Sequence, residues 1–154
     1  MTGNSTSKPR SRQGLLSIGG LFLAAAVALV ATTSHAASPD DVRRMIVEEA
    51  RETMVPASLA IAVAQVESGL RPDHQGADGA RGVFQLLPET AEGLGLEPRQ
   101  LWQPRTNIRA GLTVLDRLLD RTEGRWDEAL KAFAGRRDNG RATNAGRYVT
   151  DVLG

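Results

Sequence analysis

The chain has 154 residues, with 19 basic and 18 acidic side chains, two histidines and no cysteine. This length predicts one small domain, and the net charge of +1 argues against a nucleic-acid-binding protein, which needs a basic surface. The lack of cysteine excludes disulfide bonds and a lipid-modified cysteine, and so few histidines leave no ligand set for a structural zinc site.

The first 36 residues have the pattern of a secretory signal peptide. Their only charges are Lys8, Arg10 and Arg12, an apolar run follows over 15–31, and Ser34-His35-Ala36 has small residues where signal peptidase cleaves. A retained membrane anchor is the alternative, but the run is shorter than the about 20 residues that a spanning helix needs. We expect removal of 1–36 during export to the periplasm, which leaves 37–154 with a net charge of −2 from 16 basic and 18 acidic residues.

Signals for helix starts and ends recur along the mature chain. Ser38 and Asp41 have the spacing of a capping box, and Pro56 and Gly69 suit the start and the end of a second helix. The segment 70–82, rich in Gly and Asp, predicts a loop. Because no segment alternates like a strand, we expect an all-α, mainly helical single domain. Besides the helix that ends at Gly69, helices are predicted over 39–53, 88–93, 106–119, 126–134 and 148–153.

Glu67 ends a predicted helix that is otherwise almost free of charge. Over 57–67 the only other polar side chains are Ser58 and Gln65. A helix that is apolar all round usually lies in the centre of a fold, so we expect Glu67 on the core side. Burial and the negative end of the helix dipole would both raise the pKa of this carboxyl, as a general acid for glycosidic cleavage requires. The alternative is that Glu67 is an ordinary solvated residue at a helix end. The apolar periodicity alone leaves this alternative open.

Three sequence blocks occur in a fixed order. The first is Glu67-Ser68-Gly69. The second, at 79–85, has the pattern G-A-x-G-x-x-Q, ends at Gln85, 18 residues after Glu67, and continues into P-x-T-A at 88–91. The third, at 107–111, has the pattern N-I-x-x-G. Together these blocks resemble the lytic transglycosylases of the goose-lysozyme-like type (the SLT domain), which cut bacterial peptidoglycan. The resemblance implies a lysozyme-like helical domain with a substrate cleft.

The resemblance also implies roles for the matched residues. Glu67 would be the single catalytic acid/base, and Gln85 would line the cleft and bind substrate. Gly79 and Gly82 would let the loop backbone approach the saccharide. The remaining implied substrate-binding residues are Phe84, Asn107, Phe133 and Tyr148. Asn107 is also structural in the family, and the hydroxyl of Tyr148 would point towards the catalytic acid. For the three aromatic residues, packing in the core is the alternative.

The sequence departs from the family pattern at three places. Gly76 stands where many members have Ser nine residues after the glutamate, and Gln103 stands where the family has Asp before a proline. At 132–135 the sequence A-F-A-G replaces A-Y-N-A-G. Phe133 therefore keeps the aromatic ring of the family's tyrosine without its hydroxyl, and the amide of the family's asparagine is lost or displaced. Asn139 and Asn144 are candidates to replace that amide. None of the departures removes the acid.

The activity that the resemblance implies is cleavage of the β-1,4 bond between N-acetylmuramic acid and N-acetylglucosamine, with formation of a 1,6-anhydro ring. It implies no metal and no cofactor. One alternative is a hydrolytic muramidase, with Asp73 or Asp78 as its second carboxylate. Another is a catalytically weak peptidoglycan-binding scaffold. We expect a monomer whose partners are peptidoglycan glycan strands. It would serve general turnover or open the wall locally for a secretion, conjugation or pilus machinery.

Overall fold

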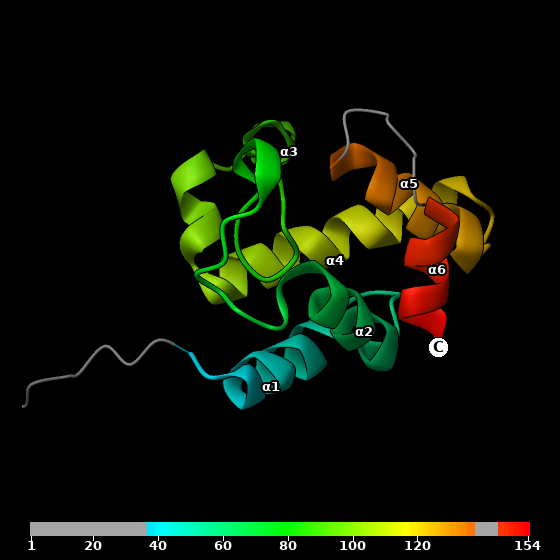
Figure 1. Ribbon diagram of the computed structural model, residues 1–154, viewed down its shortest axis with the longest axis horizontal. Helices are drawn as coiled ribbons and strands as arrows, with labels where there is room; N and C mark the ends of the chain where they lie inside the picture. The colour runs from blue at the N-terminus through cyan, green and yellow to red at the C-terminus, as the bar shows by residue number, and fades with distance from the viewer. Residues whose placement is uncertain (1–36, 138–144) are drawn as a thin grey trace, which may run out of the picture. The chain divides into compact units, whose positions relative to one another are not determined.

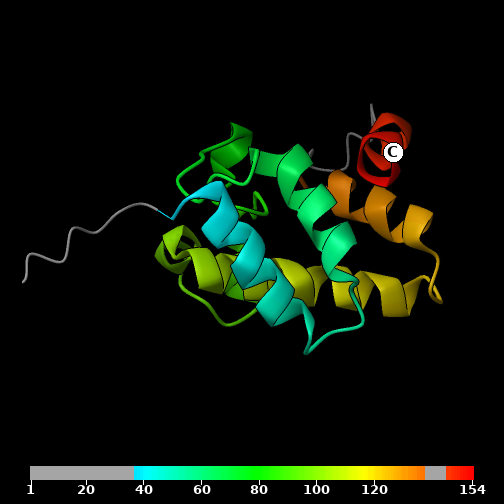
Figure 2. The same cartoon turned by 90° about the horizontal axis from the view of Figure 1, so that it is seen from below.

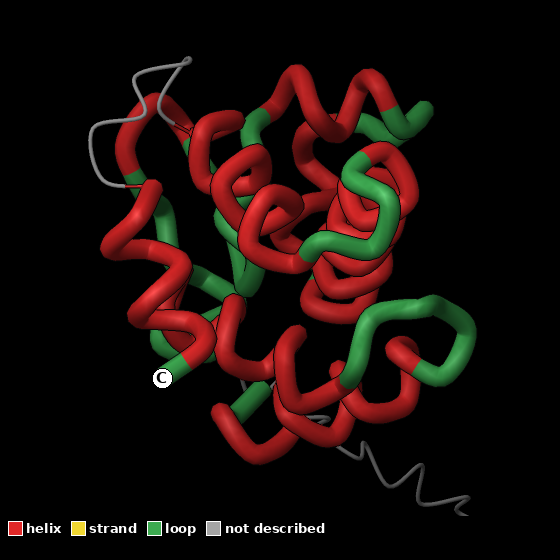
Figure 3. Tube along the Cα trace, turned by 90° about the vertical axis from the view of Figure 1, so that its right-hand side faces the viewer, coloured by secondary structure: helices red, strands yellow, loops and turns green. Residues whose placement is uncertain are grey.

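Helices make up most of the part of the chain that the structure describes. The computed structural model describes residues 37–137 and 145–154, all within one compact unit, Ser34–Gly154. The predicted signal peptide, 1–36, lies outside the described residues. Figures 1 and 3 show the helical architecture, and the prediction of a mainly helical fold is confirmed. The elements are the helices α1 (Pro39–Ala50), α2 (Ala57–Ser68), α3 (Pro88–Gly93), α4 (Pro104–Arg121), α5 (Trp126–Arg137) and α6 (Ala145–Leu153), with the 3-10 turns η1 (Ala77–Gly79) after α2 and η2 (Pro98–Trp102) after α3.

The ends of α1 and α2 follow from local hydrogen bonds. Ser38 caps α1, because its Oγ accepts the backbone N–H of Asp41 at 3.2 Å and the Asp41 carboxylate accepts the N–H of Ser38 at 3.0 Å. α1 ends at Ala50, before the predicted end at residue 53, because the hydroxyl and the N–H of Thr53 both turn back onto the carbonyl of Ala50. α2 ends before Gly69, which adopts the left-handed conformation with φ +64°.

The helices of the C-terminal half are longer than the apolar periodicity predicts. α4 extends two residues beyond the predicted 106–119 at each end. Its first residue is Pro104, whose missing N–H costs no hydrogen bond in the first turn of a helix. α5 and α6 likewise exceed their predicted lengths, because their outermost turns are polar or small and leave no apolar stripe. The turn η2, which the sequence does not predict, is closed by Gln100, whose side chain accepts the N–H of Glu97 at 2.8 Å.

Much of the described unit packs against α4. This helix lies against α1, η2 and α5, while α2 packs against α1 and α6. In Figure 1 α4 crosses the middle of the view, with α1 and α2 below it and α3 above it, and the view from below in Figure 2 shows α1 crossing α4. Over residues 37–137 and 145–154, none of the helices has the length and apolar character needed to cross a membrane.

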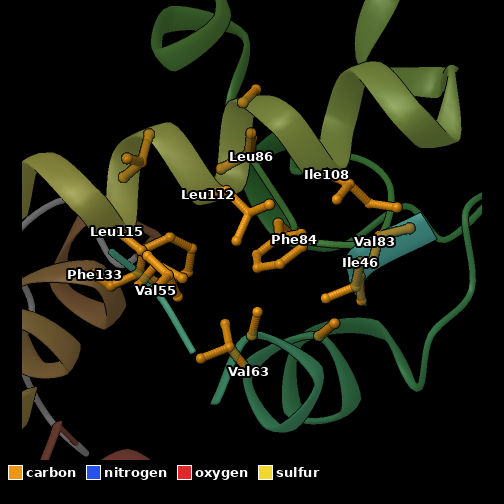
Figure 4. Packing of buried hydrophobic residues seen from close by; sticks show 14 of the residues in the cluster. Ile46, Val55, Val63, Val83, Phe84, Leu86, Ile108, Leu112, Leu115 and Phe133 are labelled. Atoms are coloured by element: carbon orange, nitrogen blue, oxygen red, sulfur yellow. The ribbon is translucent and has the colours of Figure 1, made fainter. Parts of the chain in front are cut away.

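Phe84 joins the loop after α2 to the core face of α4. The residue is completely buried, and Figure 4 shows its ring beside Leu112 of α4, on the side that faces Val63 of α2. A Cβ atom at Gly111 would lie 2.3 Å from Cγ of Phe84, so the ring rests directly on the backbone of α4. The alternative of core packing is therefore confirmed for Phe84, and its contact with substrate stays a prediction.

A cluster of ion pairs joins α1 to α4. The carboxylate of Glu49 accepts hydrogen bonds from Arg105 Nη1 at 2.6 Å and from Arg109 Nε at 2.5 Å, and Arg105 also pairs with Glu48 at 2.8 Å. The Glu49 side chain is 11% exposed, whereas the two arginines are more open to solvent. The hydrogen bond from Arg109, assisted by Arg105, holds the pKa of Glu49 below its ordinary value although burial opposes this shift.

Gly111→Ala is expected to destabilise the fold by about 1–3 kcal/mol, because the new methyl group must displace the ring of Phe84 or the helix itself. Gly135→Ala is the matched control. It lies within α5, its Cβ would meet no atom within 4 Å, and it is expected to stabilise the fold by about 0.4–1 kcal/mol. Urea unfolding followed by circular dichroism measures both free energies. A Gly111→Ala variant as stable as the wild type would contradict the contact between Phe84 and α4.

Glu49→Gln is expected to lower the free energy of unfolding by about 1 kcal/mol near neutral pH and by less at acid pH. Since the pKa of Glu49 is lower in the folded chain, its contribution is complete above the unfolded value of about 4.3 and is lost as the pH falls through the folded value. Urea unfolding at a series of pH values measures the difference. Glu52→Gln, at an exposed acid with no ion pair among the described residues, controls for the change of net charge. If Glu49→Gln lowered the free energy of unfolding by the same amount at every pH, the ionised carboxylate would be excluded as the source of the loss.

Candidate active site

Glu67 lies in the last turn of α2 and is buried, with 6% of its surface exposed. The prediction that it lies on the core side of its helix is thus confirmed. Immediately after it the chain turns sharply, because Gly69 and Leu70 both have positive φ, +64° and +62°. Their N–H groups donate to the carbonyls of Gln65 at 3.0 Å and Ala64 at 3.3 Å, so the end of the helix is closed. The raised pKa expected for Glu67 stays a prediction.

Ser68 attaches the end of α2 to the loop that carries Gln85. Its hydroxyl is buried, donates to the carbonyl of Val83 at 2.8 Å and accepts the N–H of Arg71 at 3.2 Å. The carbonyl of Ser68 in turn accepts a hydrogen bond from Arg71 Nε at 2.9 Å. The serine beside the glutamate therefore fixes the position of the loop relative to the carboxyl.

The side chain of Asn107 holds the same loop against α4. Its Oδ1 accepts the N–H of Phe84 at 2.8 Å, and its Nδ2 donates to the carbonyls of Arg81 at 2.8 Å and Leu101 at 3.0 Å. Asn107 is completely buried, so its predicted structural role is confirmed, and its contact with substrate stays a prediction. Both N–H donors of this amide are used by backbone carbonyls, so the side chain has no donor left for a sugar.

Gly82 is required by its own backbone conformation and by its close contact with Asn107. Its φ is +74°, and a Cβ atom there would lie 2.5 Å from Asn107 Nδ2 and 2.7 Å from the carbonyl oxygen of Leu101. The space where a side chain would lie is filled by the asparagine, and the approach of this backbone to the substrate stays a prediction. Gly79 also has a positive φ, +78°, but nothing crowds its Cβ position within 3.9 Å.

The amide of Gln85 is held in one orientation. Its Nε2 donates to the carbonyls of His74 at 3.0 Å and Gly82 at 2.8 Å, and its backbone has the unusual φ of +46°. Its Oε1 lies so close to Gly76 that a Cβ atom there would be 2.1 Å away. Gly76, one of the departures from the family pattern, thus leaves the room that the Gln85 amide occupies.

A small pocket brings together three of the predicted site residues, Glu67, Gln85 and Phe133. Tyr148 is buried on α6, which packs against α2, and the approach of its hydroxyl to Glu67 stays a prediction. The sequence did not single out the other lining residues, although Thr90 belongs to the P-x-T-A block and Arg136 directly follows the A-F-A-G stretch. The remaining residues around the pocket are Leu86, Leu87, Thr90, Val114 and Arg136.

A larger groove, of about 450 Å³, adjoins this pocket. The volume falls in the range of about 300–1,000 Å³ that is typical of ligand sites. Arg117 of α4 and Glu89 of α3 line the groove but not the pocket. Because the two spaces share part of their walls, a ligand in the groove would lie next to the pocket that Glu67 lines. The shared residues are Leu87, Thr90, Val114 and Arg136.

The other acids of the loop lie apart from Glu67. Asp73 and Asp78 are both exposed, and neither lines the pocket. Among the residues that the structure describes, no cluster of three or more His, Asp or Glu side chains is arranged to hold a metal ion. Asn139 and Asn144, the candidates to replace the missing family asparagine, lie outside the described residues.

The fold is similar to that of the 70 kDa soluble lytic transglycosylase of Escherichia coli, with a TM-score of 0.55 and 21% sequence identity over 72% of this chain. The matched part is 18% of that longer chain. The complex of the 70-kDa soluble lytic transglycosylase with bulgecin A matches with the same TM-score and identity, over 71% of this chain and 18% of that chain. The family model of the transglycosylase SLT domain matches residues 44–149, well over half of the sequence. The protein therefore belongs to the transglycosylase SLT domain family, whose members are lytic transglycosylases, lyases that act on peptidoglycan.

Proposed function

We propose that this protein cleaves the β-1,4 bond between N-acetylmuramic acid and N-acetylglucosamine in peptidoglycan, with Glu67 as its single catalytic acid/base. The observation that carries this proposal is the position of Glu67. It ends a buried helix, is 6% exposed, and lines a pocket together with Gln85 and Phe133. Membership of the SLT domain family supports the reaction class.

The proposed reaction needs one proton donor that later acts as a base. Protonated Glu67 donates its proton to the glycosidic oxygen as the bond from this oxygen to C1 of the muramic residue breaks. The N-acetyl group of the same residue stabilises the positive charge at C1. The carboxylate of Glu67 then removes the proton of the C6 hydroxyl, whose oxygen bonds to C1 and closes the 1,6-anhydro ring. Glu67 is protonated again, and no water is consumed.

Gln85 and Phe133 provide complementary contacts for the sugar. Because Gln85 Nε2 already donates to two loop carbonyls, only its Oε1 can serve the substrate, as an acceptor for a sugar hydroxyl or N–H. The ring of Phe133 offers an apolar surface to the face of a sugar ring. These roles make Gln85 an acceptor of fixed position rather than an adaptable amide.

A hydrolytic muramidase with Asp73 or Asp78 as its base is the less favoured alternative. Both acids are exposed and lie outside the pocket, in which Glu67 carries the only carboxylate among the described lining residues. Retaining and inverting glycosidases place two carboxylates across the scissile bond. The single acid in the pocket therefore favours the mechanism in which the substrate supplies the attacking oxygen.

The cellular setting is also part of the proposal. The sequence pattern of residues 1–36 supports export to the periplasm with a cleavable signal peptide. We take the protein to act there as a monomer on glycan strands. Local opening of the wall for a secretion, conjugation or pilus machinery is the finer form of the proposal, and general wall turnover is its alternative.

Glu67→Gln is expected to abolish cleavage of purified sacculi, with a rate at least about 100-fold below the wild type, because the amide cannot transfer the proton. Mass spectrometry of the released fragments is the measurement, and the wild type should give 1,6-anhydro ends. Asp73→Asn and Asp78→Asn are matched carboxylate-to-amide controls that should stay active.

Each other outcome of this experiment identifies an alternative. Reducing ends in the wild-type products would show a hydrolase, and a loss of activity in Asp73→Asn or Asp78→Asn would identify its base. Activity that survives in Glu67→Gln would disprove the assignment of the acid. A wild type that binds sacculi without releasing fragments would be a scaffold.

Gly76→Ala is expected to lower kcat/KM on sacculi about tenfold, because its methyl group displaces the Gln85 amide. A loss of about tenfold corresponds to one lost hydrogen bond to the substrate. The free energy of unfolding should change by no more than about 1 kcal/mol, since the displaced group is the end of a flexible side chain. Gly146→Ala, where a Cβ atom meets nothing within 4 Å, is the control. Full activity in Gly76→Ala, together with low activity in Gln85→Ala, would show that the orientation of the amide is unimportant.

A further inference from the structure

The side chain of Arg81 joins the loop that carries Gln85 to the turn η2. Its Nη1 donates to the carbonyl of Pro98 at 2.8 Å, and its Cζ lies 5.6 Å from the centre of the Trp102 ring. This distance is within the about 6 Å that is typical of a cation–π contact. Pro98 and Trp102 are the first and last residues of η2, so one guanidinium group spans the whole turn. Neither Arg81 nor Trp102 lines the Glu67 pocket.

The position of the Arg81 guanidinium is costly, so its remaining contacts must hold it there. Arg81 is half-buried, and its Nε is buried without a hydrogen-bond partner among the described residues. A buried N–H group that lacks a partner costs free energy, and the cost is larger for a charged group. The contacts that offset it are the carbonyl of Pro98 and the ring of Trp102, which stays 37% exposed.

The backbone of Arg81 closes the turn that carries Gln85. Its N–H donates to the carbonyl of Leu86 at 3.0 Å, and the N–H of Leu86 donates to the carbonyl of Arg81 at 3.1 Å. Within this turn Gln85 has a φ of +46°, which residues other than glycine adopt only where the surrounding structure holds them. Gln85 and Leu86 both line the Glu67 pocket. Arg81 therefore connects a contact outside the pocket to the turn that forms part of its wall.

The turn η2 is a fixed support for the Arg81 side chain. It packs against α3 and α4, and its carbonyl at Leu101 accepts a hydrogen bond from Asn107 of α4. The side chain of Gln100 also accepts the N–H of Glu97, which closes the start of the turn. A group that is attached to η2 is therefore held in position relative to α4.

Building on the proposed function, we propose that Arg81 and Trp102 are positioning residues for Gln85. Their stack holds the turn 81–86 against η2, and the turn fixes the Oε1 atom of Gln85 that accepts a hydrogen bond from the sugar. Asn107 holds the same turn through the carbonyl of Arg81. The stack acts through a partly exposed side-chain contact, so a substitution there loosens the turn without emptying the core.

Arg81→Met keeps the apolar stem of the side chain, removes the guanidinium and is the direct test. We expect the amide hydrogens of residues 81 and 86 to exchange about tenfold faster and kcat/KM on sacculi to fall about tenfold, the scale of one hydrogen bond to a charged group. Trp102→Leu removes only the ring and should change both by about two- to fivefold. Trp102→Phe keeps a ring and should lose less than Trp102→Leu. Hydrogen exchange followed by NMR and the rate of fragment release are the measurements.

Three comparisons separate positioning from a general loss of stability. The amides of α4 are the internal reference, because global destabilisation would speed their exchange as well. In a Gln85→Ala chain, Arg81→Met should cause no further loss of kcat/KM, because two changes that act through one group are not additive. Arg99→Met, at an exposed arginine of η2 that pairs with Glu97, makes the same change of charge and should leave exchange and kcat/KM intact.

Unchanged exchange at residues 81 and 86 in Arg81→Met would overturn the proposal. A loss of kcat/KM that persists in full in the Gln85→Ala chain, or that Arg99→Met reproduces, would overturn it as well. The exchange measurement does not depend on cleavage, so the outcome for the proposed function is read separately. A wild type that releases no fragments would disprove the proposed function, while faster exchange confined to the turn would still support the anchoring of Gln85. An active wild type with unchanged exchange in Arg81→Met would keep the enzyme and remove the anchor.

Discussion

The buried amide of Asn107 is the interaction on which the site depends. It bonds the backbone of Phe84, Arg81 and Leu101, and so fixes the loop after α2 against α4. Since Gln85 follows Phe84 directly, fixing the backbone of one places the other. A buried amide that lost these partners would leave polar groups unsatisfied, at a cost of about 1–3 kcal/mol each, so the loop has one strongly preferred position. Gly82 is the counterpart of this amide, because only glycine leaves room for it.

The two sides of the pocket are joined by short, specific contacts. Ser68 links the end of α2 to the carbonyl of Val83, so the helix end that carries Glu67 is tied to the loop that carries Gln85. The core beneath them is Phe84 resting on Gly111, which sets how closely the loop approaches α4. The proposed reaction would gain from this arrangement, because a catalytic group that folding has already positioned needs no further ordering when the substrate binds.

The charges of α4 fall into two groups with different consequences. Arg105 and Arg109 pair with acids of α1 and stabilise the contact between the two helices. Arg117, two turns further along, has no such partner among the described residues and lines the groove next to the pocket. One helix therefore carries both a structural ion-pair cluster and an arginine that lines the groove, at different positions along its axis.

The sequence by itself determined the helical class, the ends of α2, the family and the catalytic candidate, because capping residues, apolar periodicity and motif spacing are local properties. It could not show which motif residues hold the loop and which are buried in the core. Phe84 and Gly82 lie in the same block as Gln85, and Asn107 begins the next block, yet these three residues serve the core and the loop. Only the tertiary structure decided this, and only it placed Arg136 beside Glu67, because burial and pocket walls arise where segments distant in sequence meet and leave no periodic trace in the chain.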